Sequence, residues 1–335
     1  MRAAIFQGAK RIDVADVPAG SVGTRDVLLA VEACGVCGSD LASYEHGHYV
    51  TTGQVMGHEI SARVVAVGRD VRGLEPGVQV AVRPMGTCGV CGYCRAGASN
   101  LCGSTQGRSL GYGLPGGFAE EILLSDVEVG RDVVPVEVHV PPTELVWAEP
   151  LAVAVHAIGL VTRRPVESLL VVGAGSVGLC VTAAALAMGI DDVVVLEPRE
   201  HRRDAAAALG TRALAPGDLD PNEAVGGAVD TSGIPQVISN AAERVRPGGT
   251  VALLGLGDGR VPWPVGGVQL TGSFAYTDEE FRRAVDLIVS GRVRLGRFVT
   301  HRFSLEQTAA ALGVATLDET AVKAVVIPEA SDADR

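Results

Sequence analysis

The sequence predicts a two-domain α/β protein, and three observations support this prediction. Its 335 residues exceed what one ordinary hydrophobic core accommodates, so two domains are expected. A glycine-rich turn, GAGSVG at residues 173–178, stands between an apolar β-branched run and an apolar helical run. Segments typical of helices and strands alternate through the rest of that half, which is the pattern of a doubly wound parallel sheet.

The glycine-rich turn has the context of a dinucleotide-binding motif. Residues 168–172 predict a buried strand, residues 179–189 a helix ending at Gly189, and residues 191–197 a second strand. A G-x-G-x-x-G turn alone is a weak signal, but between a strand and a helix it is typical of a Rossmann domain.

Each glycine of the turn has a distinct expected role. Gly173 makes the tight turn, and Gly175 lets a pyrophosphate approach the backbone at the helix N-terminus, where negative charge is favoured. Gly178 lets helix and strand pack closely, and Val177 lies in the same cofactor-binding turn.

The end of the second strand predicts the choice of cofactor. Glu197 follows Gly173 by 24 residues, where a carboxylate accepts hydrogen bonds from ribose hydroxyls and repels a 2′-phosphate. This favours NAD over NADP. Arg199, Arg202 and Arg203 lie just beyond and either start a solvated helix or pair with a phosphate, and we count Arg202 among the cofactor-binding candidates.

Charge and hydropathy exclude several function classes. The formal net charge is −11 with no basic run, so a nucleic-acid backbone is not an expected partner. Residues 169–190 carry no charge over 22 positions, but glycines interrupt them, so a buried strand, turn and helix are favoured over a membrane span. The N-terminus has no apolar signal-like run, and we expect a cytoplasmic protein.

Four of the seven cysteines fall within fifteen residues, and their spacing predicts a structural metal site. Thiols stay reduced in the cytoplasm, where clustered cysteines more often bind metal than form disulfides. Four thiolates close a tetrahedral Zn²⁺ site and leave no position for a substrate; the alternative is a redox dithiol. The four are Cys88, Cys91, Cys94 and Cys102.

A second set of metal-type residues comes from three separate segments. Cys37 lies in CGVCGSD, His58 and Glu59 in GHE, and Glu149 opens EPLAVAVHA. An open catalytic zinc site needs three such ligands and keeps a position for a substrate oxygen. Each residue alone is a weak signal, and the prediction requires that the fold bring them together.

Taken together, these motifs resemble those of the zinc-dependent medium-chain dehydrogenase/reductase superfamily, in the branch of sorbitol, butanediol and threonine dehydrogenases. The resemblance covers nearly the whole chain. Its further motifs are YEHG (44–47), GGFAE (116–120), RPGGTV (246–251) and VTHRFSL (299–305).

The resemblance implies the domain organisation. A mostly-β, GroES-like catalytic domain is expected at residues 1–150 and 272–335, with the structural zinc lobe at 86–103. A Rossmann domain at residues 151–271 is inserted between its two parts. Relatives pair the edge near residues 261–274 across a two-fold axis, so a homodimer or homotetramer is expected.

The resemblance also implies roles around the catalytic zinc. Cys37 and His58 would be ligands, and Glu59 or Glu149 would complete the set. Asp40 would hold the His58 ring through its second nitrogen.

A proton relay through Ser39 is implied, with a change from the usual pattern. Many relatives carry a histidine three residues after the relay hydroxyl, where this chain has Ala42. His46 and His48 are candidates for the next step, as is exit through the cofactor ribose and water. By family position Lys323 would meet the cofactor pyrophosphate; an uninvolved exposed lysine is the alternative.

The implied reaction is reversible oxidation of an alcohol to a carbonyl, with zinc polarising the alcohol and a nicotinamide accepting the hydride. Polar residues in YEHGHY favour a secondary alcohol of the polyol, cyclitol or sugar class. Two alternatives stay open: a non-catalytic, zinc-stabilised NAD(H)-binding protein, and a zinc-free reductase of the same superfamily. The substrate-site candidates are Tyr44, His46, His48, Tyr49 and Phe118.

Overall fold

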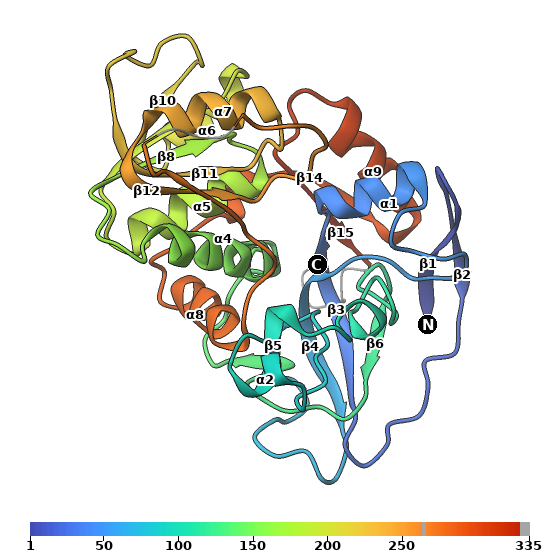
Figure 1. Cartoon of the computed structure of the whole chain (residues 1–335). Helices are drawn as coiled ribbons and strands as arrows, with labels where there is room; N and C mark the ends of the chain where they lie inside the picture. The colour runs from blue at the N-terminus through green and yellow to red at the C-terminus, as the bar shows by residue number, and fades with distance from the viewer. Residues whose placement is uncertain (263–265, 329–335) are drawn as a thin grey trace. The chain divides into compact units, whose positions relative to one another are not determined.

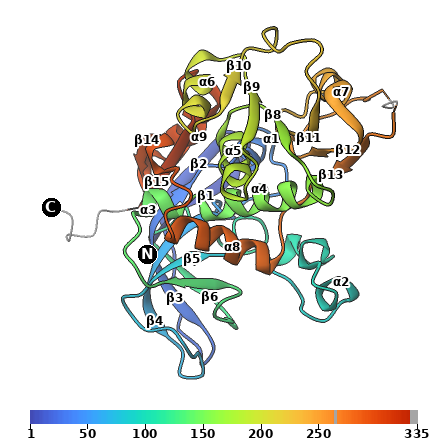
Figure 2. The same ribbon diagram turned by 90° about the vertical axis from the view of Figure 1, so that its left-hand side faces the viewer.

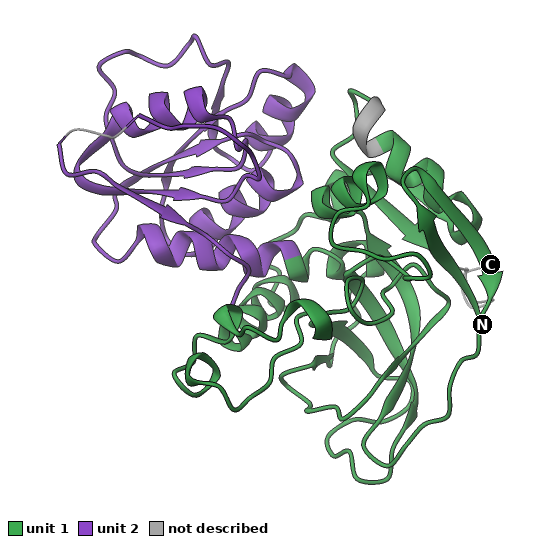
Figure 3. Cartoon of the chain, turned by 45° about the vertical axis from the view of Figure 1, so that its right-hand side comes forward, with its two compact units in different colours: residues 1–149, 277–335 green, residues 150–276 purple. Residues whose placement is uncertain are grey.

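A computed structural model describes residues 1–262 and 266–328, without the side chains of residues 315–317. The chain forms two compact units. Unit 1 comprises Met1–Glu149 and Thr277–Arg335, and unit 2 comprises Pro150–Tyr276 (Figure 3). The boundaries expected from the sequence were residues 150 and 272.

Unit 1 is built on a seven-stranded mixed sheet and a separate hairpin of β1 and β2 (Figure 1). The sheet order is β14-β15-β3-β4-β5-β7, and β6 pairs with β3. Every pair is antiparallel except β14 with β15. The strands are β1 (Arg2–Gly8), β2 (Arg11–Asp16), β3 (Val27–Gly35), β4 (Glu59–Val67), β5 (Gln79–Val82), β6 (Glu121–Leu124), β7 (Val133–Val136), β14 (Val299–Ser304) and β15 (Lys323–Ile327).

Alternation of buried and half-buried residues along β3 shows why this segment is a strand. Val27, Leu29 and Val31 are buried, and the residues between them are less so, which is the period-two pattern of a half-covered sheet. These side chains join one core with residues of β4, β5, β6 and β15. The C-terminal strand β15 therefore completes the sheet that the N-terminal half begins.

Short helices connect and cover the strands of unit 1. Figure 2 shows α2 in a lobe that projects from the sheet of this unit. The helices are α1 (Gly38–His46), α2 (Gly92–Arg95), α3 (Pro142–Leu145), α8 (Asp278–Val289) and α9 (Thr308–Leu317), with single 3-10 turns η1 (Ser99–Leu101), η2 (Gln106–Arg108), η3 (Gly296–Phe298) and η4 (Leu305–Gln307). Helix α4 (Ala148–Val161) begins in unit 1 and continues into unit 2.

Unit 2 is a six-stranded parallel sheet in the order β10-β9-β8-β11-β12-β13. The order reverses at β8, as in a doubly wound sheet, and Figure 3 shows helices on both faces. Its elements are β8 (Ser168–Val172), α5 (Ser176–Ala187), β9 (Asp192–Leu196), α6 (Glu200–Ala207), β10 (Arg212–Leu214), β11 (Val225–Asp230), α7 (Pro235–Arg244), β12 (Val245–Leu253) and β13 (Gln269–Gly272).

The uncharged segment at residues 169–190 forms β8, the glycine turn and α5, as the sequence predicts. Within the described residues, the helical run Pro142–Val161 is long and apolar enough to cross a bilayer by length and composition alone. Because 72% of its apolar window is buried in the protein, it has the character of a core helix.

Candidate metal and cofactor sites

The four clustered cysteines of the lobe converge on one point. Their sulfur atoms all lie within 4.8 Å of one another, and all four are free thiols. Four thiolates about 2.3 Å from a zinc ion stand about 3.8 Å apart at tetrahedral corners. The Cys94 sulfur lies 3.9 Å from the Cys88 sulfur and 3.5 Å from the Cys91 sulfur, so the cluster fits zinc.

Backbone N–H groups prepare the lobe for negatively charged sulfur. The N–H of Cys91 points to the Cys88 sulfur at 3.3 Å, and that of Cys88 points to the Cys102 sulfur at 3.4 Å. Hydrogen bonds from the N–H groups of Cys88 and Ser104 lower the pKa of Cys102 to about 6. Zinc binds cysteine as the thiolate, and the backbone of the loop thus favours the thiolate form of Cys102.

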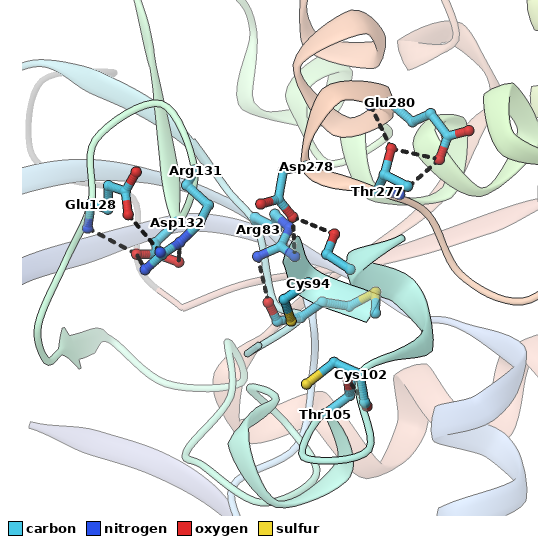
Figure 4. A network of polar contacts seen from close by, with 12 residues as sticks. Arg83, Cys94, Cys102, Thr105, Glu128, Arg131, Asp132, Thr277, Asp278 and Glu280 are labelled. Carbon is cyan, nitrogen blue, oxygen red and sulfur yellow. Dashed lines mark hydrogen bonds and ion pairs between the residues drawn. The ribbon is translucent and has the colours of Figure 1, made fainter. Parts of the chain in front are cut away.

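An ion pair between a fully buried arginine and a partly exposed aspartate links the lobe to the beginning of α8 (Figure 4). The Arg83 side chain is fully buried; its guanidinium lies 2.6 Å from Asp278 and donates to the Met85 carbonyl at 2.6 Å. The Ser99 hydroxyl, in the lobe, donates to the same Asp278 carboxylate at 2.7 Å. Thr277 caps α8 in a capping box with Glu280, so the carboxylate is held on an ordered helix turn.

The second set of metal-type residues also converges, with one exception. Ligand atoms of Cys37, His58 and Glu59 lie within 4.8 Å of one another. Sheet pairing explains this: Glu59 opens β4 opposite Gly35, the last residue of β3, and Cys37 precedes α1 two residues later. Glu149 is half-buried at the start of α4 and is not a member of this cluster.

Asp40 joins the two metal-type residues Cys37 and His58. It is buried in the first turn of α1, where it accepts the Cys37 N–H at 2.9 Å. Its other oxygen lies 3.4 Å from Nδ1 of the buried His58 ring. Nε2 is therefore the nitrogen left for a metal, which is the arrangement expected of a carboxylate behind a histidine ligand.

Lys323 does not lie as predicted. It is buried inside unit 1, where its ammonium pairs with Glu59, donates to the Val36 carbonyl at 3.3 Å and lies 5.1 Å from the centre of the Trp147 ring. The alternative of an exposed, uninvolved lysine is therefore wrong, and the ammonium that was predicted to meet the pyrophosphate is paired with the third metal-type residue. Sequence position missed this, because the pair depends on β15 lying beside β3.

Ser39 lies beside the metal cluster, as expected, and has a partner that the sequence analysis missed. Its hydroxyl donates to the Cys37 sulfur at 3.2 Å and accepts from the Tyr112 hydroxyl at 2.6 Å. The Tyr112 ring lies 5.2 Å from the His58 ring, centre to centre. Tyr112 stands in the motif GYGLPGGFAE, and no local signal distinguishes it from a packing residue.

His46 is not brought to Ser39. Both lie on α1, but seven positions apart, which is about 10 Å of helix rise. His46 is exposed at the last turn, with its ring 5.4 Å from the exposed His48 ring. The two imidazoles form a pair at the end of the helix, so α1 does not bring His46 within hydrogen-bond reach of Ser39, and its part in the relay stays a prediction.

The predicted substrate residues also separate. Phe118 is fully buried in the core of unit 1, and that prediction is wrong because the GGFA turn directs the ring inward. The half-buried Tyr44 donates its hydroxyl to the Lys10 carbonyl at 3.0 Å. Tyr49 is 54% exposed, with a φ of 67° that is uncommon for a residue with a side chain.

The glycine turn of unit 2 leaves no room for side chains at two of its positions. Gly173 has a φ of 94°, and a Cβ on Gly178 would stand 2.0 Å from the Gly173 carbonyl oxygen. The turn ends at the N-terminus of α5, where the positive end of the helix dipole favours a phosphate. Val177 is half-buried in the first turn of α5. This backbone fits a dinucleotide pyrophosphate.

Glu197 lies directly after β9 and is tied to the glycine turn. One carboxylate oxygen accepts the Ala174 N–H at 2.8 Å, and the other accepts the Arg199 N–H at 3.0 Å. Arg202 lies over the turn, with a terminal guanidinium nitrogen 3.5 Å from where a Gly175 Cβ would stand. Burial and the nearby Arg199 charge lower the pKa of Arg202.

Comparison with known proteins decides the family. Residues 23–136 match the family described as Alcohol dehydrogenase GroES-like domain, and residues 176–290 match the family described as Zinc-binding dehydrogenase. The chain is 30% identical to sorbitol dehydrogenase of Bacillus subtilis, over 93% of this chain and 92% of that one. It belongs to the zinc-dependent medium-chain alcohol dehydrogenase family.

Other relatives agree with this membership. L-threonine 3-dehydrogenase of Pyrococcus furiosus is 31% identical over 88% of each chain. A zinc-binding dehydrogenase of Sinorhizobium meliloti, solved bound to NADP, superposes with a TM-score of 0.89 at 27% identity over 98% of this chain and 99% of that one. The predicted fold is confirmed, and the cofactors of this dehydrogenase are zinc and a nicotinamide dinucleotide.

Proposed function

We propose that this dehydrogenase oxidises a secondary alcohol of the polyol, cyclitol or sugar class to a ketone, reversibly. The observation that supports it most is the convergence of Cys37, His58 and Glu59 beside the Ser39 hydroxyl. A ligand set of this kind, with a hydroxyl within reach, suits an open catalytic zinc better than a closed structural one.

Each residue of the Cys37 cluster would have a separate role in catalysis. Cys37 and His58 would hold the catalytic zinc with Glu59 as third ligand, because the Glu149 carboxylate lies outside the cluster. When bound, zinc lowers the pKa of an alcohol hydroxyl, and the nicotinamide accepts a hydride. Ser39 would take the proton of the alcohol while it releases its own hydroxyl proton outward, toward the cofactor ribose and water, and Asp40 would keep the His58 ring oriented.

Cofactor choice follows from unit 2. The Glu197 carboxylate accepts one N–H from the turn, that of Ala174, and one from Arg199; there it favours ribose hydroxyls and opposes a 2′-phosphate. We therefore infer NAD as the preferred cofactor, with Arg202 placed to contact the pyrophosphate side of the turn.

The substrate class rests on the names of relatives and on local polarity. Relatives include sorbitol dehydrogenase of Bacillus subtilis, and L-galactonate-5-dehydrogenase of Escherichia coli at 29% identity over 84% of this chain. Both names denote hydroxyl-rich substrates, and the exposed imidazoles of His46 and His48 offer hydrogen bonds to such molecules.

We further propose that the protein is cytoplasmic and that it forms a homodimer or homotetramer.

A substrate screen tests the proposal. Purified zinc-loaded enzyme is incubated with polyols, cyclitols, sugar derivatives and simple alkyl alcohols, each with NAD and with NADP, and reduced cofactor is measured at 340 nm. We expect a higher kcat/KM with a hydroxyl-rich secondary alcohol and NAD. A preference for a primary alkyl alcohol would contradict the substrate class, and a preference for NADP would contradict the role of Glu197.

A further inference from the structure

A pair of exposed imidazoles at the end of α1 stands apart from both metal clusters. The ring centres of His46 and His48 lie 5.4 Å apart, and their planes are tilted by 43°. Within the described residues, neither imidazole has a hydrogen bond or an ion pair. Imidazole nitrogens are common ligands of zinc, copper and nickel ions. The pair therefore offers two metal ligands that this part of the chain does not otherwise use.

The separation of the rings suits two imidazoles bound to one ion. Zinc–nitrogen bonds of about 2.0–2.1 Å place the ion about 3.2 Å from each ring centre. At a tetrahedral angle the two ring centres would then stand about 5.2 Å apart. The observed 5.4 Å is close to this separation, so small rotations of the exposed side chains suffice to direct one nitrogen of each ring at a common point.

The backbone explains why the second imidazole lies beside the first. Residues two positions apart on a continuous helix do not face each other. Gly47 ends α1 with a φ of 70°, and its N–H donates to the Ser43 carbonyl at 2.8 Å. Tyr49 follows with a φ of 67°, which is uncommon for a residue with a side chain. The left-handed turn around His48 thus reverses the chain at the helix end.

The end of α1 is also fixed, and its polarity favours a cation. The Lys10 N–H, in the turn between β1 and β2, donates to the Tyr44 carbonyl at 2.6 Å, and the Tyr44 hydroxyl donates to the Lys10 carbonyl at 3.0 Å. The Lys10 ammonium lies 2.9 Å from the Glu45 carboxylate, so its positive charge is compensated. The C-terminus of a helix carries a partial negative charge. An ion bound by the two imidazoles would lie at this ordered, negatively polarised end.

We propose that His46 and His48 form a third metal site, which binds a divalent transition-metal ion such as Zn²⁺ weakly and reversibly. Water would fill the remaining positions, because no third His, Cys, Asp or Glu of the described residues completes the set. The site itself goes beyond the proposed catalytic function. Its consequence rests on that function: imidazoles that hold an ion no longer offer hydrogen bonds to substrate hydroxyls, so excess metal inhibits in competition with the alcohol.

Equilibrium dialysis tests the site directly. Enzyme loaded with its two predicted zinc ions is dialysed against rising free Zn²⁺ at constant pH, and bound zinc is counted. Because the site has half the protein ligands of a structural zinc site, we expect a Kd between about 1 µM and about 1 mM. Wild-type enzyme should take up one further ion per chain in this range, and H46Q and H48Q should not. The control H139Q removes an exposed histidine elsewhere in unit 1 and should keep the uptake.

Initial rates test the consequence of binding. Added Zn²⁺ should raise the KM of the wild-type enzyme for the best alcohol of the screen and leave kcat unchanged. At a free Zn²⁺ concentration equal to the Kd from dialysis, competition predicts a rise in KM of about twofold. In H48Q, the KM should not respond to Zn²⁺ over the same range.

The outcomes separate this inference from the proposed catalytic function. If wild-type enzyme binds no ion beyond the first two, or if both H46Q and H48Q keep the further ion, the site is excluded and the Cys37 cluster is unaffected. Uptake of the ion without a rise in KM would overturn the inhibition. If the assignment of Cys37 is wrong instead, Cys37→Ser begins the dialysis with two ions, and the uptake at the histidine pair is still measured.

Discussion

Glu59 contributes both to the metal cluster and to the stability of the folded chain. Its carboxylate belongs to the cluster of Cys37 and His58, yet it also pairs with the buried ammonium of Lys323. Gly35 makes room for the pair, because a Cβ there would stand 2.0 Å from the Glu59 carboxylate. A buried charge needs a compensating partner, and in this site either the lysine or a metal can provide one.

Glu59 and Glu149 should differ in their effect on zinc content. Glu59→Gln removes a carboxylate from the cluster and should lower the affinity of the catalytic zinc about 10- to 100-fold. Glu149→Gln, the matched control, should leave zinc content unchanged. Metal analysis after dialysis against a weak chelator makes the comparison, and loss of zinc from the Glu149 variant alone would reverse the assignment.

Lys323→Met should destabilise the metal-free protein more than the zinc-loaded one. Removing the ammonium leaves the Glu59 carboxylate buried and uncompensated, which costs about 3 kcal/mol or more in the apoprotein. Bound zinc supplies a positive charge to the same carboxylate, so the loss should shrink in the holoprotein. Thermal unfolding of both forms measures the difference; equal losses would mean that Glu59 does not ligate the metal.

Sites that depend on spacing within one loop were predicted from the sequence, whereas contacts between distant segments were not. The four-cysteine spacing is a property of one loop, and those sulfurs lie together. Lys323, Phe118 and Tyr112 take their roles from strands and turns far away in sequence. Lys323 faces Glu59 across 264 positions, and Tyr112 bonds Ser39 across 73. Pairing at such range has no signature in the residues themselves.

At the scale of elements, the strand–turn–helix unit of β8 and α5 was predictable in detail. Residues 168–172 are buried throughout, the turn follows at Gly173, and α5 begins at Ser176. Apolar period and glycine positions are local properties, so the sequence contains them. The mixed sheet of unit 1 was reached by family resemblance instead, because pairing of β15 with β3 joins the two ends of the chain.

Gly178→Ala should damage cofactor binding selectively. The added Cβ would collide with the Gly173 carbonyl at 2.0 Å and displace the turn from the pyrophosphate. We expect NADH binding, followed by fluorescence titration, to weaken at least tenfold while zinc content stays the same. Gly217→Ala, where a Cβ meets nothing within 4 Å, is the control. Unchanged affinity for NADH in the Gly178 variant would exclude this turn as the pyrophosphate site.

The attachment of the zinc lobe to α8 also has a measurable strength. Arg83→Met removes a fully buried guanidinium and leaves the partly exposed Asp278 with one partner fewer, so the free energy of unfolding should fall by about 2 kcal/mol. Arg63→Met removes a half-exposed pair with Glu32 and should cost less than about 1 kcal/mol. Urea denaturation at fixed zinc concentration compares the two, and equal losses would contradict the anchoring role of Arg83.

At the scale of the whole molecule, two metal clusters and a glycine turn divide the chemistry between units. Both clusters lie in unit 1, and the dinucleotide turn lies in unit 2. Glycine pattern, cysteine spacing and chain length together predict this division. The substrate is less predictable, because it depends on exposed side chains such as His46 and Tyr49, whose identity the fold does not constrain.

Zinc counting in Cys37→Ser tests the central claim most directly. The claim is that Cys37 and His58 hold a catalytic zinc separate from the four-cysteine structural zinc. Wild-type enzyme should contain two zinc ions per chain, and the variant should contain one and lose turnover, while its lobe keeps the remaining ion. A variant that retains two zinc ions, or that turns over like wild type, would contradict the account.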